Sequence, residues 1–235
     1  VFKYGAREFI YTYEAADDPL APLVVILHGH SKEPRASRFR SSEWNVLCPV
    51  DRYGYQGWGS WFLGEDGEYF WLEAMPALVR YVYKGRKIYF CGSSMGGYGA
   101  ILHGIQMRAY GVYANVAQTR LLGSTYSESG MKKFFEPIFG TDRRSRFNDL
   151  GSLITRDLPT SFILTGLRWD KPCYLEEQTF PFLDKLCRCE VNFRSEIRFG
   201  HGHSLTYTMP EAINLFKSAG EDIEGHYEAK IAAQG

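Results

Sequence analysis

The residues best suited to chemistry in this sequence surround a serine in a glycine-rich turn. Ser94 occupies the middle of Gly92-Ser-Ser-Met-Gly96, a G-x-S-x-G pattern that follows the apolar stretch 87–91 and precedes a stretch typical of a helix. A strand, a sharp turn and a helix expose such a serine as a nucleophile. The two glycines remove side chains that would collide in so strained a backbone. Phosphate and dinucleotide loops need other spacings, so we predict that Ser94 is a nucleophile.

A serine hydroxyl is a weak nucleophile and needs a nearby base, which a third group must orient. With this kind of turn the partners follow in the order serine, acid, histidine, each just after a strand. Asp170 follows the apolar stretch 161–164, and His203 follows the stretch 191–199. We therefore predict Asp170 and His203 as the acid and the base. His203 is preferred over His201 because it lies farther from the strand, on a glycine-flanked turn.

Other carboxylates compete with Asp170 for the role of the acid. Asp157, Glu176 and Asp184 lie in the same part of the chain. Asp170 could also be an ordinary turn residue that caps the helix expected after Pro172. The order of the motifs favours Asp170, and the alternatives stay open at this point.

A second motif could hold a developing negative charge. The early apolar stretch 23–27 ends in His28-Gly29-His30. A strand that ends in this way supplies one N–H of an oxyanion hole, opposite the N–H of the residue after the nucleophile. We therefore predict the backbone N–H groups of Met95 and His30 as the donors, each typically worth roughly 3 kcal/mol to the transition state. The side chain of His28 is expected to brace this loop, and substrate contact is the alternative.

Two His-x-His pairs, His28/His30 and His201/His203, raise the question of a metal site. Imidazoles two residues apart on a strand point to the same face. Neither pair has a third histidine or a carboxylate at ligand spacing. We therefore expect no metal ion and no organic cofactor.

Eight aromatic side chains fall within nineteen residues among glycines: Tyr53, Tyr55, Trp58, Trp61, Phe62, Tyr69, Phe70 and Trp71. If this segment overhangs Ser94, its flat rings could hold a sugar ring or an aryl acid. A hydrophobic plug that covers the sheet is the alternative. The candidate substrate-binding residues are His28, Trp58, Trp61 and Tyr98.

A scaffold of alternating strands and helices must position these residues. Short apolar stretches alternate with amphipathic ones, which predicts β-α-β units on a mostly parallel sheet, and hence an α/β protein. Strands are expected at 23–27, 45–48, 87–91, 112–116, 161–164 and 191–199. The alternation of Phe9, Tyr11 and Tyr13 predicts a half-exposed strand near a sheet edge. Helices are expected at 68–83 with a break at Pro76, at 95–107, at 175–186 and at 210–218.

Two long segments, 51–67 and 118–156, fit neither pattern. Long irregular segments inside a compact α/β domain are more often functional loops than linkers. The sequence shows no repeat and no domain boundary. We therefore expect one domain over residues 1–235, either alone or as a piece of a longer protein.

The composition excludes several kinds of partner. The 27 basic and 27 acidic side chains cancel to a net charge of zero, which argues against nucleic acid. The longest apolar run, 20–27, contains Pro22 and is far shorter than the roughly 20 residues that span a bilayer. Five cysteines without a CxxC pair, and no visible secretory signal, favour free thiols and a cytoplasmic location. A small-molecule or saccharide ester is the expected partner, and the oligomeric state stays open.

Several segments between residues 23 and 205 carry a resemblance to a known family. They are 92–100 (Gly-Ser-Ser-Met-Gly-Gly-Tyr-Gly-Ala), 61–62 with 69–76, 135–140 with 148–149, and 200–204. They resemble the nucleophile segment, the aromatic stretch, the later insertion and the Gly-Gly-His-Ser ending of the α/β-hydrolase superfamily. Within it, the likeness is to the group that contains esterase D, feruloyl esterases and mycolyltransferases. The turn from Gly166 to Asp170 is one residue longer than the acid-bearing turn of that group.

This resemblance implies an α/β-hydrolase fold, with a mostly parallel sheet, flanking helices and elaborated loops over the active site. It implies a carboxylester hydrolase that forms an acyl-enzyme on Ser94, with His203 as base and Asp170 as acid. Two alternatives stay open, because a fold does not fix a function. One is an acyltransferase that uses the same triad with an alcohol or sugar acceptor. The other is a catalytically silent module of a polysaccharide-synthesis or export assembly.

Overall fold

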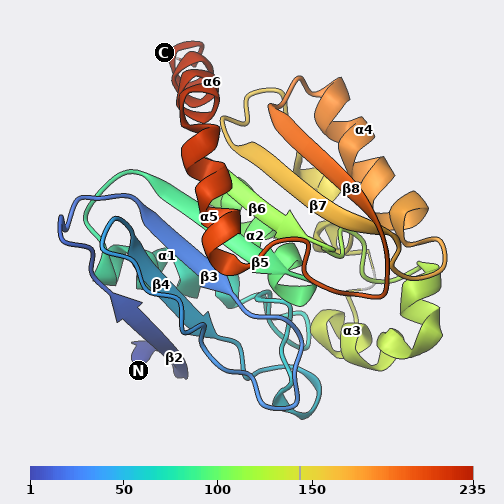
Figure 1. Cartoon of the computed structure of the whole chain (residues 1–235). Helices are drawn as coiled ribbons and strands as arrows, with labels where there is room; N and C mark the ends of the chain where they lie inside the picture. The colour runs from blue at the N-terminus through green and yellow to red at the C-terminus, as the bar shows by residue number, and fades with distance from the viewer. Residues whose placement is uncertain (143, 235) are drawn as a thin grey trace.

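One sheet of eight strands runs through the described part of the chain, residues 1–142 and 144–234 of a computed structural model. The strands are β1 (Phe2–Tyr4), β2 (Arg7–Glu14), β3 (Leu23–Leu27), β4 (Asn45–Val50), β5 (Ile88–Ser93), β6 (Gly111–Asn115), β7 (Ser161–Trp169) and β8 (Phe193–His201). Their order is β1-β2-β4-β3-β5-β6-β7-β8 (Figure 1). Neighbours from β4 to β8 pair in parallel, and β1 and β2 add an antiparallel edge. The predicted mostly parallel sheet is confirmed.

The burial of the strands follows their place in the sheet. β3, β4 and β6 are buried at every position, which explains their continuous apolar sequences. β2 lies next to the short edge strand β1 and is mostly half-exposed, as predicted from its alternating aromatic residues. β8 forms the opposite edge, is largely exposed, and begins at Phe193 instead of residue 191.

Helices cover both faces of the sheet. They are α1 (Trp71–Val82), α2 (Met95–Gln106), α3 (Lys132–Phe139), α4 (Phe180–Arg188), α5 (Met209–Ser218) and α6 (Gly220–Ala232). Buried side chains of α1, α2, α3 and α4 share one large core with the sheet. Side chains of α5 and α6 pack in a second, smaller core on the other face, and Figure 1 shows α5 in front of the strands, with α6 continuing from it to the C-terminus. The sheet is therefore covered on both sides in the three-layer manner of α/β proteins.

The predicted break at Pro76 does not occur. α1 continues from Trp71 to Val82 with Pro76 inside it. A proline cannot donate to the carbonyl four residues earlier, which here belongs to Leu72. The side chain of Gln106, on the neighbouring helix α2, donates to that carbonyl instead. A tertiary contact thus replaces the hydrogen bond that the proline removes.

Two helices were not expected from the sequence. α3 lies inside the segment 118–156, and α6 follows α5 after a single residue. In α6 only Ile223 is buried, so no apolar stripe marks this helix in the sequence. None of the helices in the described ranges is long and apolar enough to cross a membrane.

His103 makes the stability of the fold dependent on pH. It is fully buried in α2, and its Nε2 donates to the carbonyl of Phe62 at 2.8 Å. Burial lowers the pKa of His103 to about 4. The unfolded chain binds this proton below about pH 6.5, whereas the folded chain does so only near pH 4, so stability falls as the pH drops through this window. We expect the protonation of His103 alone to lower the free energy of unfolding by about 3 kcal/mol between pH 7 and pH 4.

Urea unfolding of wild type and His103→Gln at several pH values tests this expectation. The glutamine amide can keep the hydrogen bond to Phe62 but does not titrate. The free energy of unfolding of the variant should depend less steeply on pH between 6.5 and 4. Equal slopes for the two proteins would contradict it.

Candidate active site

Ser94 lies at a strained turn between β5 and α2. Its φ of 55° and ψ of −119° place a non-glycine residue in a rarely populated backbone region. A Cβ on Gly92 would lie 2.1 Å from the carbonyl oxygen of Gly96, and one on Gly96 would lie 2.2 Å from that of Leu27. The glycines therefore allow the first turn of α2 to pack against the end of β3. This is the sharp turn that the G-x-S-x-G pattern predicts.

The predicted acid and base meet at the carboxyl end of the sheet. Asp170 directly follows β7 and is almost completely buried, and the Nδ1 atom of His203 lies 2.8 Å from both of its carboxylate oxygens. The backbone N–H of Gly202 donates to the carbonyl of Trp169, which ties the loop after β8 to the end of β7. Because a carboxylate only accepts, Nδ1 carries the hydrogen and Nε2 is left as an acceptor.

The competing residues lie elsewhere. His201 stacks on the ring of Trp169 at 5.0 Å and does not reach the acid. The three alternative acids form surface ion pairs with arginines: Asp157 with Arg108, Glu176 with Arg168, and Asp184 with Arg188. The geometry therefore pairs His203 with Asp170 and with no other predicted candidate.

The ring of His203 sits between two tyrosines. Tyr126 stacks on it at 6.0 Å, and Tyr174 meets it edge-on at 5.5 Å. Burial raises the pKa of Tyr126 to about 12 and that of Tyr174 well above its ordinary value, so both hydroxyls stay neutral beside the Asp170 carboxylate. The Nε2 atom of His203 is buried and has no hydrogen-bond partner within residues 1–142 and 144–234. Ser94 and His203 are therefore not hydrogen-bonded to each other in this structure.

Gln118 contacts the Ser94 hydroxyl and was missed by the sequence analysis. It is fully buried, and its Nε2 donates to the Ser94 Oγ at 3.1 Å and to the Tyr174 hydroxyl at 2.9 Å. Its Oε1 accepts from the indole N–H of Trp61 at 3.0 Å. The one available signal was its position three residues after the buried strand β6, at the same edge of the sheet as Ser94.

The predicted oxyanion donors belong to the start of α2 and to the loop after β3. The N–H of Met95 opens α2, where the first N–H groups have no carbonyl within the helix to bond. The ring of His30 packs among Trp61 and Phe134, at 5.3 and 4.5 Å. Burial lowers the pKa of His30, so the ring is neutral. His30 thus anchors its loop in an aromatic cluster, which would hold its backbone N–H in place.

His28 is fixed by hydrogen bonds on both ring nitrogens. Nδ1 donates to the carbonyl of Gly29 at 2.8 Å, and Nε2 accepts from the N–H of Asp51 at 2.9 Å. Burial lowers the pKa of His28, consistent with a neutral ring that accepts. The side chain braces the loop, and neither nitrogen is free for a substrate.

Three of the eight aromatic residues of this segment, Trp61, Phe62 and Trp71, are buried. The buried carboxylate of Asp51 accepts from the backbone N–H groups of Ser60 at 2.7 Å and Phe62 at 2.8 Å. Trp61 and Phe62 are consequently enclosed, with no exposed surface. Tyr98 is equally enclosed and donates to a backbone carbonyl. For Trp61 and Tyr98 the structure therefore corrects the expectation of substrate contact, because both pack into the core.

Trp58 is the aromatic candidate that stays half-exposed. Its ring stacks on Phe134 and has the Lys32 ammonium 5.2 Å above it. A cleft of about 490 Å³ lies next to it, lined by Lys32, Glu33, Pro34, Arg35, Arg52 and Gly57. Glu33 forms an ion pair with Arg35. The cleft therefore carries an excess of positive charge beside the loop that contains His30.

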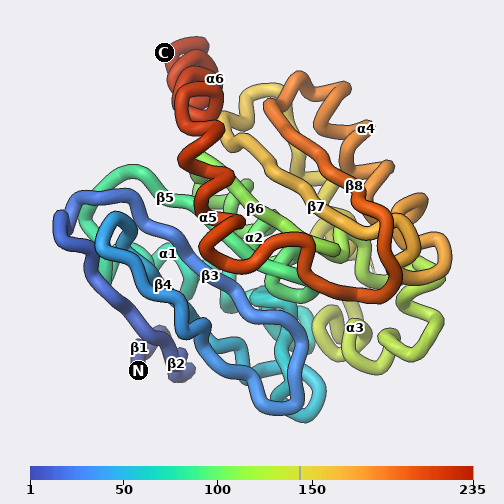
Figure 2. Tube along the Cα trace, viewed as in Figure 1, coloured from blue at the N-terminus to red at the C-terminus, as the bar shows by residue number. Residues whose placement is uncertain are grey.

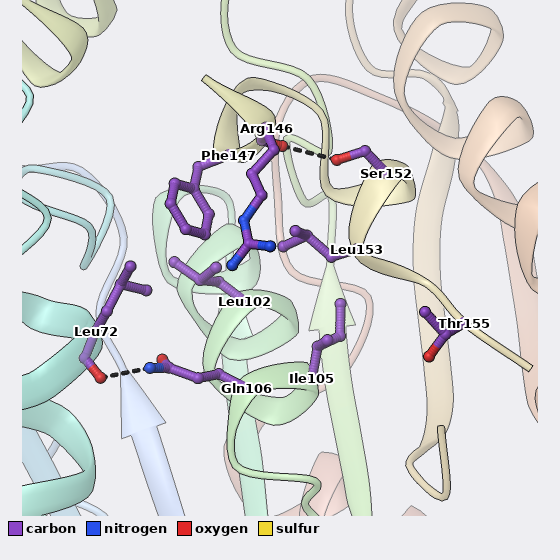
Figure 3. Close-up of a pocket in the computed structure, with 9 residues that line it drawn as sticks. All are labelled: Leu72, Leu102, Ile105, Gln106, Arg146, Phe147, Ser152, Leu153 and Thr155. Carbon is purple, nitrogen blue, oxygen red and sulfur yellow. Dashed lines mark hydrogen bonds between the residues drawn. The ribbon is translucent and has the colours of Figure 1, made fainter. Parts of the chain in front are cut away.

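A second cavity lies away from these residues. It measures about 250 Å³ and is lined by Leu72 of α1, the far half of α2 and the segment 146–155 (Figure 3). None of the predicted site residues lines it. Within the described ranges no group of three histidine, cysteine, aspartate or glutamate side chains could hold a metal ion.

No protein-family model and no curated protein sequence matches the chain. Solved structures do. The capsule O-acetyltransferase of Neisseria meningitidis serogroup A aligns with a TM-score of 0.70 and 18% identity, over 94% of this chain and 92% of that one. An S-formylglutathione hydrolase from Agrobacterium tumefaciens aligns with a TM-score of 0.60 and 19% identity, over 93% of this chain and 88% of that one. A ferulic acid esterase aligns with a TM-score of 0.56 and 15% identity, over 89% of this chain and 90% of that one.

The chain has the α/β-hydrolase fold. The sheet order, the covering helices and these neighbours agree, so the fold implied by the resemblance is confirmed. At such low identity the neighbours show the fold of this chain and not its substrate. A mutant of the capsule O-acetyltransferase has also been described in complex with CoA. Figure 2 traces the chain from β1 at one edge of the sheet to α6 at the C-terminus.

Proposed function

We propose that this chain is a serine hydrolase that cleaves a carboxylic ester, with an acylated small molecule or saccharide as substrate. The observation that carries the proposal is the His203–Asp170 pair, whose free Nε2 lies buried at the edge of the sheet where the strained Ser94 is also placed. Three of the similar structures support it. By their names they are an esterase, a thioester hydrolase and an acetyltransferase.

In the acylation step the Ser94 Oγ attacks the ester carbonyl carbon while its hydrogen passes to the Nε2 of His203. Asp170 holds the ring by Nδ1 and stabilises the imidazolium that forms. The N–H groups of Met95 and His30 hold the oxyanion of the tetrahedral intermediate. The intermediate then collapses, the bond to the leaving alkoxide breaks, and the alcohol departs with the proton from Nε2.

Deacylation repeats these steps with water as the nucleophile. The Nε2 of His203 takes a proton from water, and the hydroxide attacks the acyl carbon. Collapse of the second intermediate breaks the bond between that carbon and the Ser94 Oγ, which recovers its hydrogen from Nε2. The acid is released, and the enzyme returns to its starting state.

Hydrolysis of 4-nitrophenyl acetate by the purified chain tests this function. We expect release of nitrophenol in excess of enzyme, with a first turnover faster than later ones where deacylation limits the rate. A folded protein that releases no nitrophenol from this ester or from longer acyl esters would overturn the proposal and favour the silent module of a larger assembly.

Acyl transfer is the second candidate, and the cleft beside Trp58 favours it. Lys32 and Arg52 have no acidic partner in the described ranges and could bind the phosphates of an activated acyl donor such as acetyl-CoA. In that case Lys32→Ala and Arg52→Ala should raise KM for acetyl-CoA but not for 4-nitrophenyl acetate. Added glycerol or glucose should divert the acyl group from water. If acetyl-CoA is no better a donor than S-acetylpantetheine, hydrolysis stays the better account.

A further inference from the structure

The hydrogen bonds of Gln118 determine which way its amide faces. The indole nitrogen of Trp61 can only donate, so the group that meets it at 3.0 Å must be the amide oxygen. The NH₂ group therefore faces Ser94 and Tyr174. The Tyr174 hydroxyl donates its one hydrogen to the carbonyl of Val116 at 2.6 Å, so it must accept from the amide. Both hydrogens of the Gln118 amide are thus accounted for, and one of them is donated to the Ser94 Oγ.

Because the Gln118 amide donates to the Ser94 Oγ, the hydroxyl hydrogen of Ser94 must point away from that amide. A hydroxyl that accepts from Gln118 cannot direct its own hydrogen back at the same NH₂ group. In the described ranges two histidines near this cluster have a buried Nε2 without a partner: His203, whose ring contacts Tyr174, and His30, whose ring stacks on Trp61. His203 is the base of the proposed mechanism, and because its Nδ1 donates to the Asp170 carboxylate, its Nε2 is an acceptor. We propose that Gln118 is a positioning residue that turns the Ser94 hydroxyl hydrogen toward His203, and that Trp61 holds the amide in the required orientation. This inference rests on the proposed function.

Trp61 thereby acquires a role different from substrate binding. It is fully enclosed, and its indole N–H donates to the Gln118 amide oxygen at 3.0 Å. Without that N–H the amide could rotate and present its oxygen to Ser94. The hydroxyl would then donate to the amide, and its hydrogen would point away from His203.

Two substitutions at position 118 change the polarity of this contact with little change in shape. Gln118→Met removes the donor and should lower kcat about tenfold, as expected for one lost hydrogen bond, with KM nearly unchanged. Gln118→Glu replaces the donor by an acceptor. An ionised carboxylate would draw the Ser94 hydrogen away from His203, so kcat should fall on the order of 100-fold.

The pH profile separates positioning from mere structural support. At low pH the new carboxyl of Gln118→Glu is protonated and can donate to Ser94, whereas at high pH it can only accept. Its kcat relative to wild type should therefore fall as the pH rises. Trp61→Phe should lose kcat several-fold, and Trp61→Phe combined with Gln118→Met should be no slower than Gln118→Met alone.

Gln178 provides a matched control. It is also fully buried, and its amide oxygen accepts from the backbone N–H groups of Thr119 and Arg120, at 2.8 Å each. Gln178→Met should lower the melting temperature about as much as Gln118→Met but leave kcat within twofold of wild type. If Gln118→Met does not fold, the pH profile of Gln118→Glu decides the question.

The inference is overturned if folded Gln118→Met keeps kcat within twofold, or if Gln118→Glu shows the same loss at every pH. Either result on a wild-type chain that hydrolyses 4-nitrophenyl acetate leaves the proposed function intact. A folded wild type without that activity would instead overturn the proposed function, and the role of Gln118 with it.

Discussion

Replacing Ser94 by alanine is expected to lower kcat/KM for 4-nitrophenyl acetate by about 10⁴-fold or more, because the acyl-enzyme cannot form without its oxygen. The residual rate would come from the oxyanion donors and from substrate binding. Initial rates over a range of substrate concentrations measure the effect. Thermal unfolding should show that the variant is folded, since the change removes one hydroxyl and leaves the apolar core unchanged.

The neighbouring serine gives the matched control for this change. The Ser93 hydroxyl accepts from the side chain of Asn115 at 2.9 Å and lies at the end of β5, one residue before the turn. Ser93→Ala should therefore cost some stability but keep kcat/KM within about threefold, as is usual for a lost hydrogen bond of about 0.5 kcal/mol. A reversal of the two results would show that the reactive hydroxyl has been misassigned.

Asp170→Asn is expected to reduce kcat by about 10⁴-fold while leaving the shape of the site intact. The amide cannot stabilise an imidazolium, and it can donate to Nδ1, which would move the hydrogen of His203 to Nε2, where the base must accept. Steady-state kinetics of Asp170→Asn and His203→Ala measure the loss. The two changes together should cost little more than the larger one alone, because the residues act as a unit.

Two controls bracket this second prediction. His201→Ala removes the other histidine of the pair, which stacks on Trp169 and touches no acid. Asp184→Asn removes an exposed acid of an ion pair with Arg188, where surface pairs contribute at most about 1 kcal/mol. Both should keep near wild-type kcat. If His201→Ala is inactive and His203→Ala is active, the base has been assigned to the wrong histidine.

The sequence predicted the parts of the fold that depend on local patterns. The buried strands are continuous apolar runs, and the turn at Ser94 needs glycines at fixed positions, so both are visible without coordinates. The order of Ser94, Asp170 and His203 in the chain likewise predicted a triad, and in the structure Asp170 and His203 are in contact. For the acid and the histidine, spacing after a strand was a sufficient guide, because parallel strands end at one edge of the sheet.

The errors share a different physical origin, namely contacts between distant segments. Gln106 compensates for Pro76 from another helix, and no local rule predicts this. The carboxylate of Asp51 draws the aromatic loop inward through backbone N–H groups, so Trp61 packs in the core instead of lining a substrate site. Gln118 looks like an ordinary loop residue until the fold places its amide against Ser94.

The most direct test of the central claim is the site and rate of labelling by a fluorophosphonate, read by mass spectrometry of the digested protein. We predict one adduct per chain, on the Ser94 oxygen, and labelling slowed about 100-fold or more in His203→Ala because the hydroxyl then lacks its base. A folded chain that takes no label, or takes it on another residue, would contradict the account. So would labelling of Ser94 at the same rate with and without His203.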